Sequence, residues 1–171
     1  MRFSPTLPAV LAFWAACTFT TCVRAAETLP VQEVPPQPVS FIDRTVDNVE
    51  AALDRALDLI GIRYRRGGSN PESGFDCSGF VGHVFREGLG LYLPRSAREM
   101  SKSGDEVHKE ELKPGDLVFF NTMRRTFSHV GIYLGDNLFV HSPRVGGKVR
   151  IEDLRDRYWT RRYNGARRVA D

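Results

Sequence analysis

The chain has 171 residues, of which 42% are apolar and 26% are charged, and its formal net charge is +3. This length suits one domain with a real hydrophobic core. The ordinary charge fraction and the 3 Cys exclude disordered, fibrous and disulfide-stapled classes. No apolar run reaches the ~18–20 residues that span a bilayer. With 24 basic against 21 acidic side chains, the charge is too balanced for a dedicated nucleic-acid-binding protein.

Residues 1–25 have the composition of an export signal. A basic residue at position 2 is followed by an apolar stretch and by a small-residue cleavage site that ends at Ala25. The other interpretation is a buried N-terminal helix, which the absence of acidic residues from this segment disfavours. Trp14–Cys17 resembles a bacterial lipoprotein box, in which Cys17 would carry a lipid and become the N-terminus. We expect export with either form of the signal.

The positions of the cysteines matter more than their number. Cleavage at the end of the signal would remove Cys17 and Cys22, leaving Cys77 alone in a mature chain of 146 residues with net charge +1. A single thiol in an exported protein forms no internal disulfide, so it is either buried and inert or kept for chemistry. Residues 26–43 are proline-rich and predict an extended linker. The domain is then expected over residues 44–171.

Helices are expected in the first half of this domain. Apolar residues recur every three or four positions over Thr45–Ile60, which predicts an amphipathic helix followed by Gly61. A second helix should begin at Asp76, as N-cap, or at Cys77, and end at the glycine of position 88 or 90. A capping box at Ser96–Glu99 predicts a short third helix. The apolar stripe of the first helix consists of Val46, Val49, Leu53, Leu57 and Ile60.

Strands are expected in the second half of the domain. The runs with strand composition and turn residues at their ends are Leu117–Phe120, Ser128–Leu134, Leu138–Ser142, Lys148–Ile151 and Tyr163–Val169. Helices followed by a central antiparallel sheet of about five strands define an α+β fold.

Cys77 has the sequence context of a nucleophile. The first turn of a helix places a sulfur near unpaired backbone N–H groups, where a thiol pKa of ~8.5 can fall to ~3.5–7.5. The alternative is a small buried core residue. The polar, glycine-containing segment Asp76–Gly79 argues against that alternative.

A thiol nucleophile needs a base, which is normally histidine. His108 lies in a charged run and is expected at the surface, and His83 is expected to face another side of the second helix. His129 and His141 lie on the two strands of the predicted hairpin. A three-residue loop, Gly135–Asn137, would point both side chains to the same face, whereas a two- or four-residue loop would separate them. The spacing alone also suits a purely structural histidine pair.

Six segments share a further property, which is their order along the chain. They are Tyr64–Gly68, Asp76–Val81, Leu93–Ser96, Leu112–Phe120, Ser128–Gly135 and Phe139–His141. Together they closely resemble the NlpC family of bacterial cell-wall cysteine peptidases, over about residues 46–169. The resemblance implies a papain-like fold, with Cys77 as nucleophile, His129 as general base and acid, and His141 as the residue that orients His129. Tyr64 would line the oxyanion site, together with the backbone N–H of Cys77.

The resemblance also implies a function. We expect a cysteine endopeptidase that cleaves amide bonds in peptidoglycan stem peptides or crosslinks through a thioester acyl-enzyme. An amidase or acyltransferase on the same scaffold, or an inactive peptidoglycan-binding module, are the alternatives. Arg66 and Met100 depart from the Trp and Gln frequent in the family, and could alter which stem peptide is accepted. The weaker candidates for substrate contact are Asp76, Ser78, Arg95 and Ser96.

No cofactor or metal is expected, since the chain has no His-Glu-x-x-His motif and no cysteine pair with zinc spacing. We expect a monomer in the periplasm or envelope of a Gram-negative bacterium, without a transmembrane span. If the lipoprotein form of the signal is used, a lipid on Cys17 would hold the protein at the outer membrane. The arginine-rich stretch Arg155–Arg168 contains aromatic residues. Its aromatics are expected to close the core while its arginines face water or the anionic cell wall, and a nucleic-acid patch is the less favoured interpretation.

Overall fold

A computed structural model describes residues 41–122 and 125–170. The expected signal, residues 1–25 with Cys17 and Cys22, lies outside these residues, as does most of the expected linker. The first helix begins at Phe41, inside the linker expected over residues 26–43. Within the described part of the chain, no helix is long and apolar enough to cross a bilayer.

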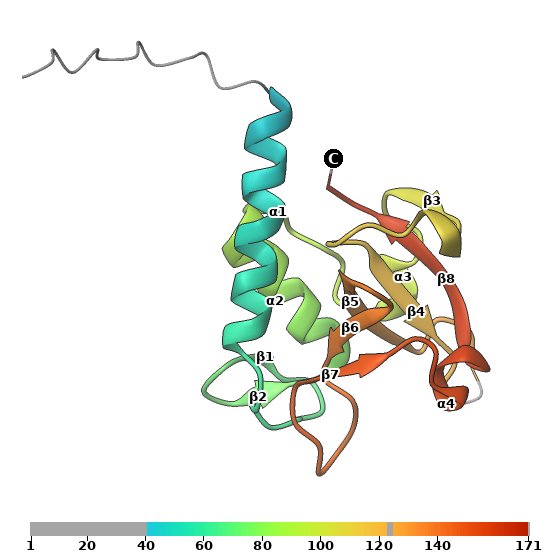
Figure 1. The fold of residues 1–171 in the computed structure, drawn as a ribbon. Helices are drawn as coiled ribbons and strands as arrows, with labels where there is room; N and C mark the ends of the chain where they lie inside the picture. Colours follow the sequence, from blue (N-terminus) through green and yellow to red (C-terminus); the bar gives the residue numbers. More distant parts are fainter. Residues whose placement is uncertain (1–40, 123–124, 171) are drawn as a thin grey trace, which may run out of the picture. The chain divides into compact units, whose positions relative to one another are not determined.

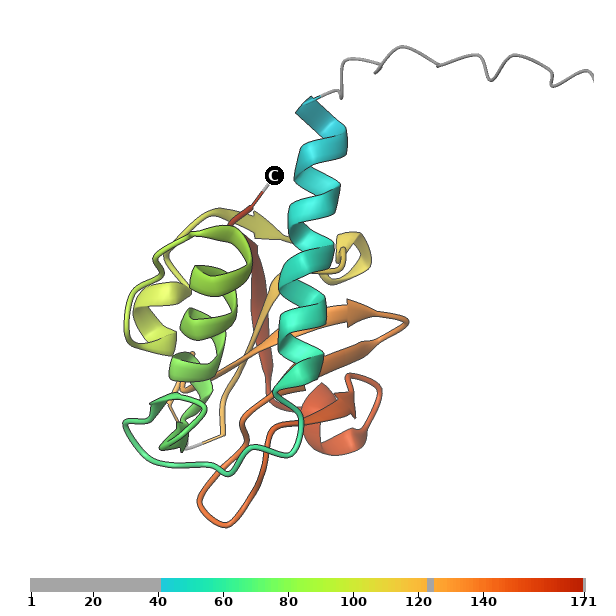
Figure 2. The ribbon, with the colours of Figure 1, turned by 90° about the vertical axis from the view of Figure 1, so that its left-hand side faces the viewer.

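Two helices pack beside a six-stranded sheet, which confirms the expected α+β class (Figures 1 and 2). The sheet order is β3-β8-β4-β5-β6-β7, and every neighbouring pair is antiparallel. The helices are α1 (Phe41–Asp58), α2 (Cys77–Leu89), α3 (Ala97–Met100) and α4 (Arg157–Thr160), with a 3₁₀ turn at Lys109–Glu111. The sheet strands are β3 (Asp105–Val107), β4 (Leu117–Phe120), β5 (His129–Gly135), β6 (Leu138–His141), β7 (Arg150–Asp153) and β8 (Tyr163–Arg168). A small hairpin, β1 (Ser69–Asn70) and β2 (Gly74–Phe75), precedes α2.

The five expected strands are all present, and β3 is a sixth that the sequence pattern missed. Its three residues, Asp105–Val107, include two acidic side chains and give no apolar alternation. The strand forms because it pairs with β8, where Glu106 lies opposite Arg167 and forms an ion pair with it at 3.4 Å. At this edge of the sheet, an ion pair across the strands therefore accompanies the burial of the single apolar residue Val107.

Helix α1 is confirmed, but its buried face differs from the expected stripe. Leu57 and Ile60 are 41% and 45% exposed, whereas Ala52, Ala56 and Leu59 are buried. The reason is close packing against α2 rather than burial of the largest apolar side chains. The stripe prediction was therefore wrong at its C-terminal end.

Small residues make this close packing possible. A Cβ on Gly88 of α2 would lie 2.6 Å from the Cα of Ala52 and 2.9 Å from its Cβ. Helix α2 itself begins and ends as expected, with Asp76 as N-cap and Gly90, at φ 65°, as C-cap. Its buried apolar residues are Phe80, Val81, Val84 and Phe85. Helix α2 is thereby held against α1 on one side and the sheet on the other.

The hairpin between β5 and β6 differs from the expected loop, although its register is the expected one. Only Asp136 and Asn137 connect the strands, both with positive φ (51° and 65°). A bulge between Tyr133 and Gly135 supplies the odd residue that a three-residue loop would have supplied. The pairs before the bulge, such as Ile132 with Val140, keep the register in which the histidines share a face.

The contact between α1 and α2 predicts that replacing glycine by alanine changes the stability of the protein in opposite directions at two positions of α2. Gly88→Ala is expected to lower the free energy of unfolding by about 1–3 kcal/mol, because the new methyl group collides with the backbone of Ala52. Gly82→Ala is the matched control, since its new methyl group would lie 3.8 Å from Met100 Cε. It should raise stability by up to ~1 kcal/mol through helix propensity. Urea unfolding measures both, and equal stability of the two variants would contradict this packing.

Candidate active site

The start of α2 carries Cys77 on a rigid turn. The Asp76 carboxylate accepts hydrogen bonds from the backbone N–H of Gly79 at 2.7 Å and of Gly67 at 2.9 Å. A Cβ on Gly79 would lie 2.0 Å from the carbonyl oxygen of Gly68, so only glycine permits this approach of the preceding loop. The loop and the first helical turn are therefore locked together, and the direction of the Cys77 side chain is set.

Arg95 reinforces the same turn from a distant part of the chain. Its guanidinium donates to both oxygens of Asp76, at 2.9 and 2.7 Å, and to Ser78 Oγ at 2.9 Å. Ser96 is instead the N-cap of α3 and bonds Glu99. The structure thus brings Asp76, Ser78 and Arg95 together in support of the helix start, and their contact with substrate stays a prediction, as it does for Ser96.

His129 and His141 form a buried pair, as the register predicted. Nε2 of His129 and Nδ1 of His141 are 2.7 Å apart, and the two residues are 3% and 0% exposed. Gly131 gives His141 the space it needs, because a Cβ at this position would lie 2.8 Å from the Phe139 ring and 3.2 Å from His141 Cβ. The contact uses Nε2 of His129, so Nδ1 is the ring nitrogen left for Cys77.

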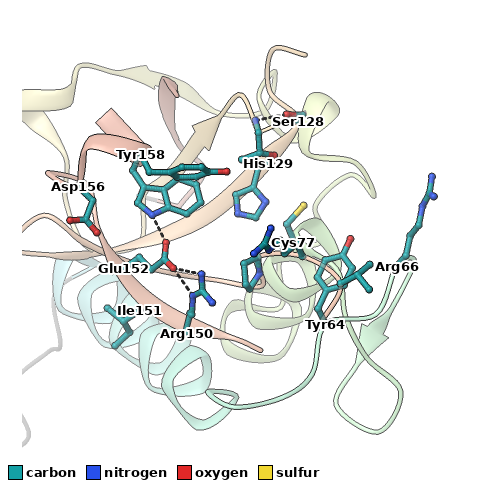
Figure 3. Close-up of a pocket in the computed structure, with 15 residues that line it drawn as sticks. Tyr64, Arg66, Cys77, Ser128, His129, Arg150, Ile151, Glu152, Asp156 and Tyr158 are labelled. Carbon is teal, nitrogen blue, oxygen red and sulfur yellow. Dashed lines mark hydrogen bonds and ion pairs between the residues drawn. The ribbon is translucent and has the colours of Figure 1, made fainter. Parts of the chain in front are cut away.

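Figure 3 shows the Cys77 sulfur beside the His129 ring. Both residues line one cleft, and the backbone N–H of Val130, directly after His129, is close enough to the sulfur to lower the pKa of the thiol. Trp159 closes the other side of the imidazole, with its ring stacked 5.8 Å from that of His129. The remaining lining residues are Tyr64, Arg66, Thr122, Ser128, Pro143, Arg144, Val145, Arg150, Ile151, Glu152, Asp156 and Tyr158.

Sequence reasoning missed Glu152 and the role of Trp159. Nε2 of His141 lies 3.6 Å from Oε2 of Glu152, and the indole N–H of Trp159 donates to that same oxygen. Arg150 binds the other carboxylate oxygen. The register could have indicated this contact, because Glu152 pairs with Phe139, two residues before His141 and on the same face of the strand.

Burial sets the charge state of the thiol. Desolvation raises the pKa of Cys77 above its usual 9.0 and Asp76 adds to the effect, whereas backbone N–H groups of Val130, Ser78 and Cys77 itself lower it less. The expectation of a lowered thiol pKa at the helix start was therefore wrong for the resting site. The N–H groups are present, but desolvation of the sulfur outweighs them.

Burial acts on the base in the complementary direction. Desolvation lowers the pKa of His129 well below 6.5, and His141 lowers it further, while the Glu152 carboxylate raises it. The pKa of His141 is likewise below 6.5, because burial lowers it more than the Glu152 carboxylate raises it. Thiol and imidazole are thus both neutral near pH 7, so the proton must move when Cys77 attacks.

The other candidate residues have separate places. Tyr64 and Arg66 line the cleft. Burial raises the pKa of the Tyr64 hydroxyl, and the neighbouring Cys77 raises it further. Met100 is fully buried in the core beside α2 and does not line the cleft, so it offers substrate no direct contact, and its influence on substrate choice stays a prediction. His83 is buried against Phe75 rather than in the cleft.

His108 is exposed at the start of the 3₁₀ turn, as expected. The arginine-rich stretch follows its expected pattern in part: Trp159 is buried, but Arg168 forms an ion pair with the buried Asp116 at 2.8 Å instead of facing water. Within residues 41–122 and 125–170, no three His, Cys, Asp or Glu side chains are grouped to hold a metal ion.

Known proteins resemble this chain in sequence and in structure. The chain is 47% identical over 126 residues to murein DD-endopeptidase MepS/murein LD-carboxypeptidase and 45% identical over 123 residues to murein DD-endopeptidase MepH, both of Escherichia coli (strain K12). The matches cover 74% and 70% of this chain but 65% and 45% of these relatives, so the chain spans less than two thirds of either.

The fold of this chain also resembles that of a solved structure. An NlpC/P60 family protein from Bacillus cereus ATCC 10987 superposes with a TM-score of 0.68 at 33% identity, over 72% of this chain and 40% of that one. The model of the NlpC/P60 family matches residues 61–168, which include the cysteine, both histidines and the whole sheet. The chain therefore belongs to the NlpC/P60 family.

Proposed function

We propose that this protein is a cysteine peptidase that hydrolyses amide bonds in the stem peptides or crosslinks of peptidoglycan. The observation that carries the proposal is the meeting of Cys77 and His129 in one cleft, with the buried His141 in contact with the far nitrogen of the His129 ring. Family membership supports the cysteine chemistry, and the relatives named murein endopeptidases support the substrate class.

The contacts suggest how the chemistry proceeds. Cys77 attacks the amide carbonyl carbon, its S–H proton moves to Nδ1 of His129, and a C–S bond forms. The C–N bond then breaks as His129 passes the proton to the leaving amine, which leaves a thioester. A water molecule, deprotonated by His129, attacks the thioester, releases the acid and returns the proton to the sulfur.

The oxyanion formed in both steps needs a donor near the sulfur. The backbone N–H of Cys77 and the hydroxyl of Tyr64 are the candidates, since Tyr64 lines the cleft beside the thiol. One such donor typically contributes ~10²–10³ in rate. The raised pKa of Tyr64 keeps its hydroxyl protonated and able to donate.

The charge of the cleft fits an acidic substrate. Arg66, Arg144 and Arg150 are exposed residues of its lining, and Arg150 is paired with Glu152. Guanidinium groups bind carboxylates well, and stem peptides carry free carboxylates. We further propose that residues 1–25 act as an export signal, which brings the protein to this substrate.

Removing the nucleophile or the base should abolish hydrolysis. Cys77→Ala is expected to eliminate turnover of defined muropeptides, and His129→Ala to lower kcat by about 10²–10⁴-fold, the contribution of general base catalysis. His108→Ala is the matched control, because this histidine is exposed and outside the cleft. Mass spectrometry of the products measures each rate and identifies the bond that is cut.

Equal activity of Cys77→Ala and the unmodified protein would overturn the proposal. Binding of muropeptides without any product from the unmodified chain would favour an inactive binding module. Transfer of the acyl group to an added amine, in place of hydrolysis, would favour an acyltransferase.

The pKa directions predict a broad pH optimum. Activity requires neutral His129 and a thiol proton to transfer, and burial moves the pKa of His129 below 6.5 and that of Cys77 above 9.0. The ratio kcat/KM should therefore be constant from pH 6.5 to 9.0, falling only outside that range. The rate of alkylation of Cys77 by iodoacetamide should still rise with pH at pH 9.0, because the thiolate fraction levels off only above the thiol pKa. An alkylation pKa well below 9.0 would instead indicate a thiolate–imidazolium pair at rest.

A further inference from the structure

We propose that Glu152 is a positioning residue that selects the tautomer of both histidines, extending the relay from Cys77 through His129 and His141 to a carboxylate. The inference deepens the function proposed above and rests on it for its kinetic test only.

Glu152 is fixed at the inner wall of the cleft (Figure 3). Its side chain is only 19% exposed, and Oε2 accepts from the indole N–H of Trp159 while Oε1 is bound by Arg150. The same Oε2 faces Nε2 of His141 at 3.6 Å. Within the described residues no hydrogen bond reaches that buried nitrogen, so Glu152 is the polar group the structure gives it.

The tautomers follow from this contact by elimination. An ionised carboxylate accepts hydrogen bonds and donates none, so Nε2 of His141 must carry the proton that faces Glu152. Neutral His141 then has a lone pair on Nδ1, which accepts from Nε2–H of His129 across the 2.7 Å contact. His129 is thereby left with a lone pair on Nδ1, the nitrogen available to take the proton of Cys77.

The charge of Glu152 has a second effect on the same relay. Burial raises the pKa of Glu152, but the nearby His141 and the bound Arg150 lower it more and hold it at about 2, so the group is anionic at every pH used for assay. This anion favours the imidazolium that forms on His129 when the thiol proton arrives. Low exposure makes such an interaction strong.

Other ionisable groups also face this relay. Besides the two histidines, they are Tyr64 and Arg66 before α2, Cys77 at its start, Arg144 and Arg150 around β7, Asp156 before α4, and Tyr158 in α4. Arg150 opposes Glu152 in its effect on the pKa of His141. Neutralising Glu152 and neutralising Arg150 are therefore expected to shift the pKa values of the histidine pair in opposite directions.

The decisive variant is Glu152→Gln, which keeps the shape of the side chain. The amide lacks the charge and offers one acceptor oxygen in place of two, so it cannot accept both at the Oε2 position, which faces His141 and Trp159, and at the Oε1 position, which faces Arg150. The matched control is Asp153→Asn, which neutralises the next residue of β7. Its carboxylate has a pKa of about 2, set by Arg155, and lies outside the cleft.

Three readouts distinguish tautomer selection from a structural or substrate-binding role. Glu152→Gln should lower kcat about 10-fold or more, below the 10²–10⁴-fold of the general base itself, with KM little changed. The acid limb of kcat/KM should move to lower pH, because loss of the anion lowers the pKa of His129. Arg150→Gln should move the same limb to higher pH. Asp153→Asn should change neither quantity.

The third readout needs no activity. In a Cys77→Ala background, ¹⁵N NMR of the imidazole nitrogens should show an unprotonated Nδ1 on His129 with Glu152 present, and a different proton distribution in Glu152→Gln. Identical ring spectra for Glu152→Gln and Asp153→Asn would overturn the inference, as would a raised KM with unchanged kcat and pH profile. If the unmodified protein cleaves no peptidoglycan, the proposed function fails, while the NMR comparison still decides the role of Glu152.

Discussion

The 2.7 Å contact between His129 and His141 is the constraint on which the rest of the domain depends. A buried polar group without a partner costs about 1–3 kcal/mol, so β5 and β6 must pair in the one register that brings the rings together. That register needs the bulge after Tyr133 and the space left by Gly131. Aromatic rings surround the pair and exclude water, and α2 then has only to bring Cys77 to the remaining ring nitrogen.

Desolvation explains why the resting site is neutral rather than an ion pair. A helix N-terminus stabilises a nearby anion by about 0.3–1 kcal/mol, whereas burying an ion costs several kcal/mol. The second effect prevails at Cys77, and the same burial keeps His129 unprotonated and able to act as a base. A dry site also strengthens each electrostatic contact that remains, which is why one carboxylate two residues along the relay can matter.

Much of this arrangement could be predicted from local sequence signals, and the remainder could not because it depends on tertiary contacts. Asp76 as N-cap and the shared face of the histidines follow from patterns within a few residues of each. The buried face of α1 does not, since Gly88 of another helix decides which of its residues lie inside. Strand β3 depends on pairing with β8, and Glu152 gains its place only once β7 lies beside β6.

The two-residue turn and the adjacent bulge have a consequence for how this domain can vary. Hairpin tips at a protein surface normally accept insertions and deletions with little effect. Here the length of the turn at Asp136–Asn137 sets the register of β6 against β5. One residue more or fewer would turn His141 to the opposite face of β6, away from His129. A length change between β6 and β7 would leave both histidines on their faces, and would instead affect the cleft residues Pro143, Arg144 and Val145 and the strand pairing that places Glu152.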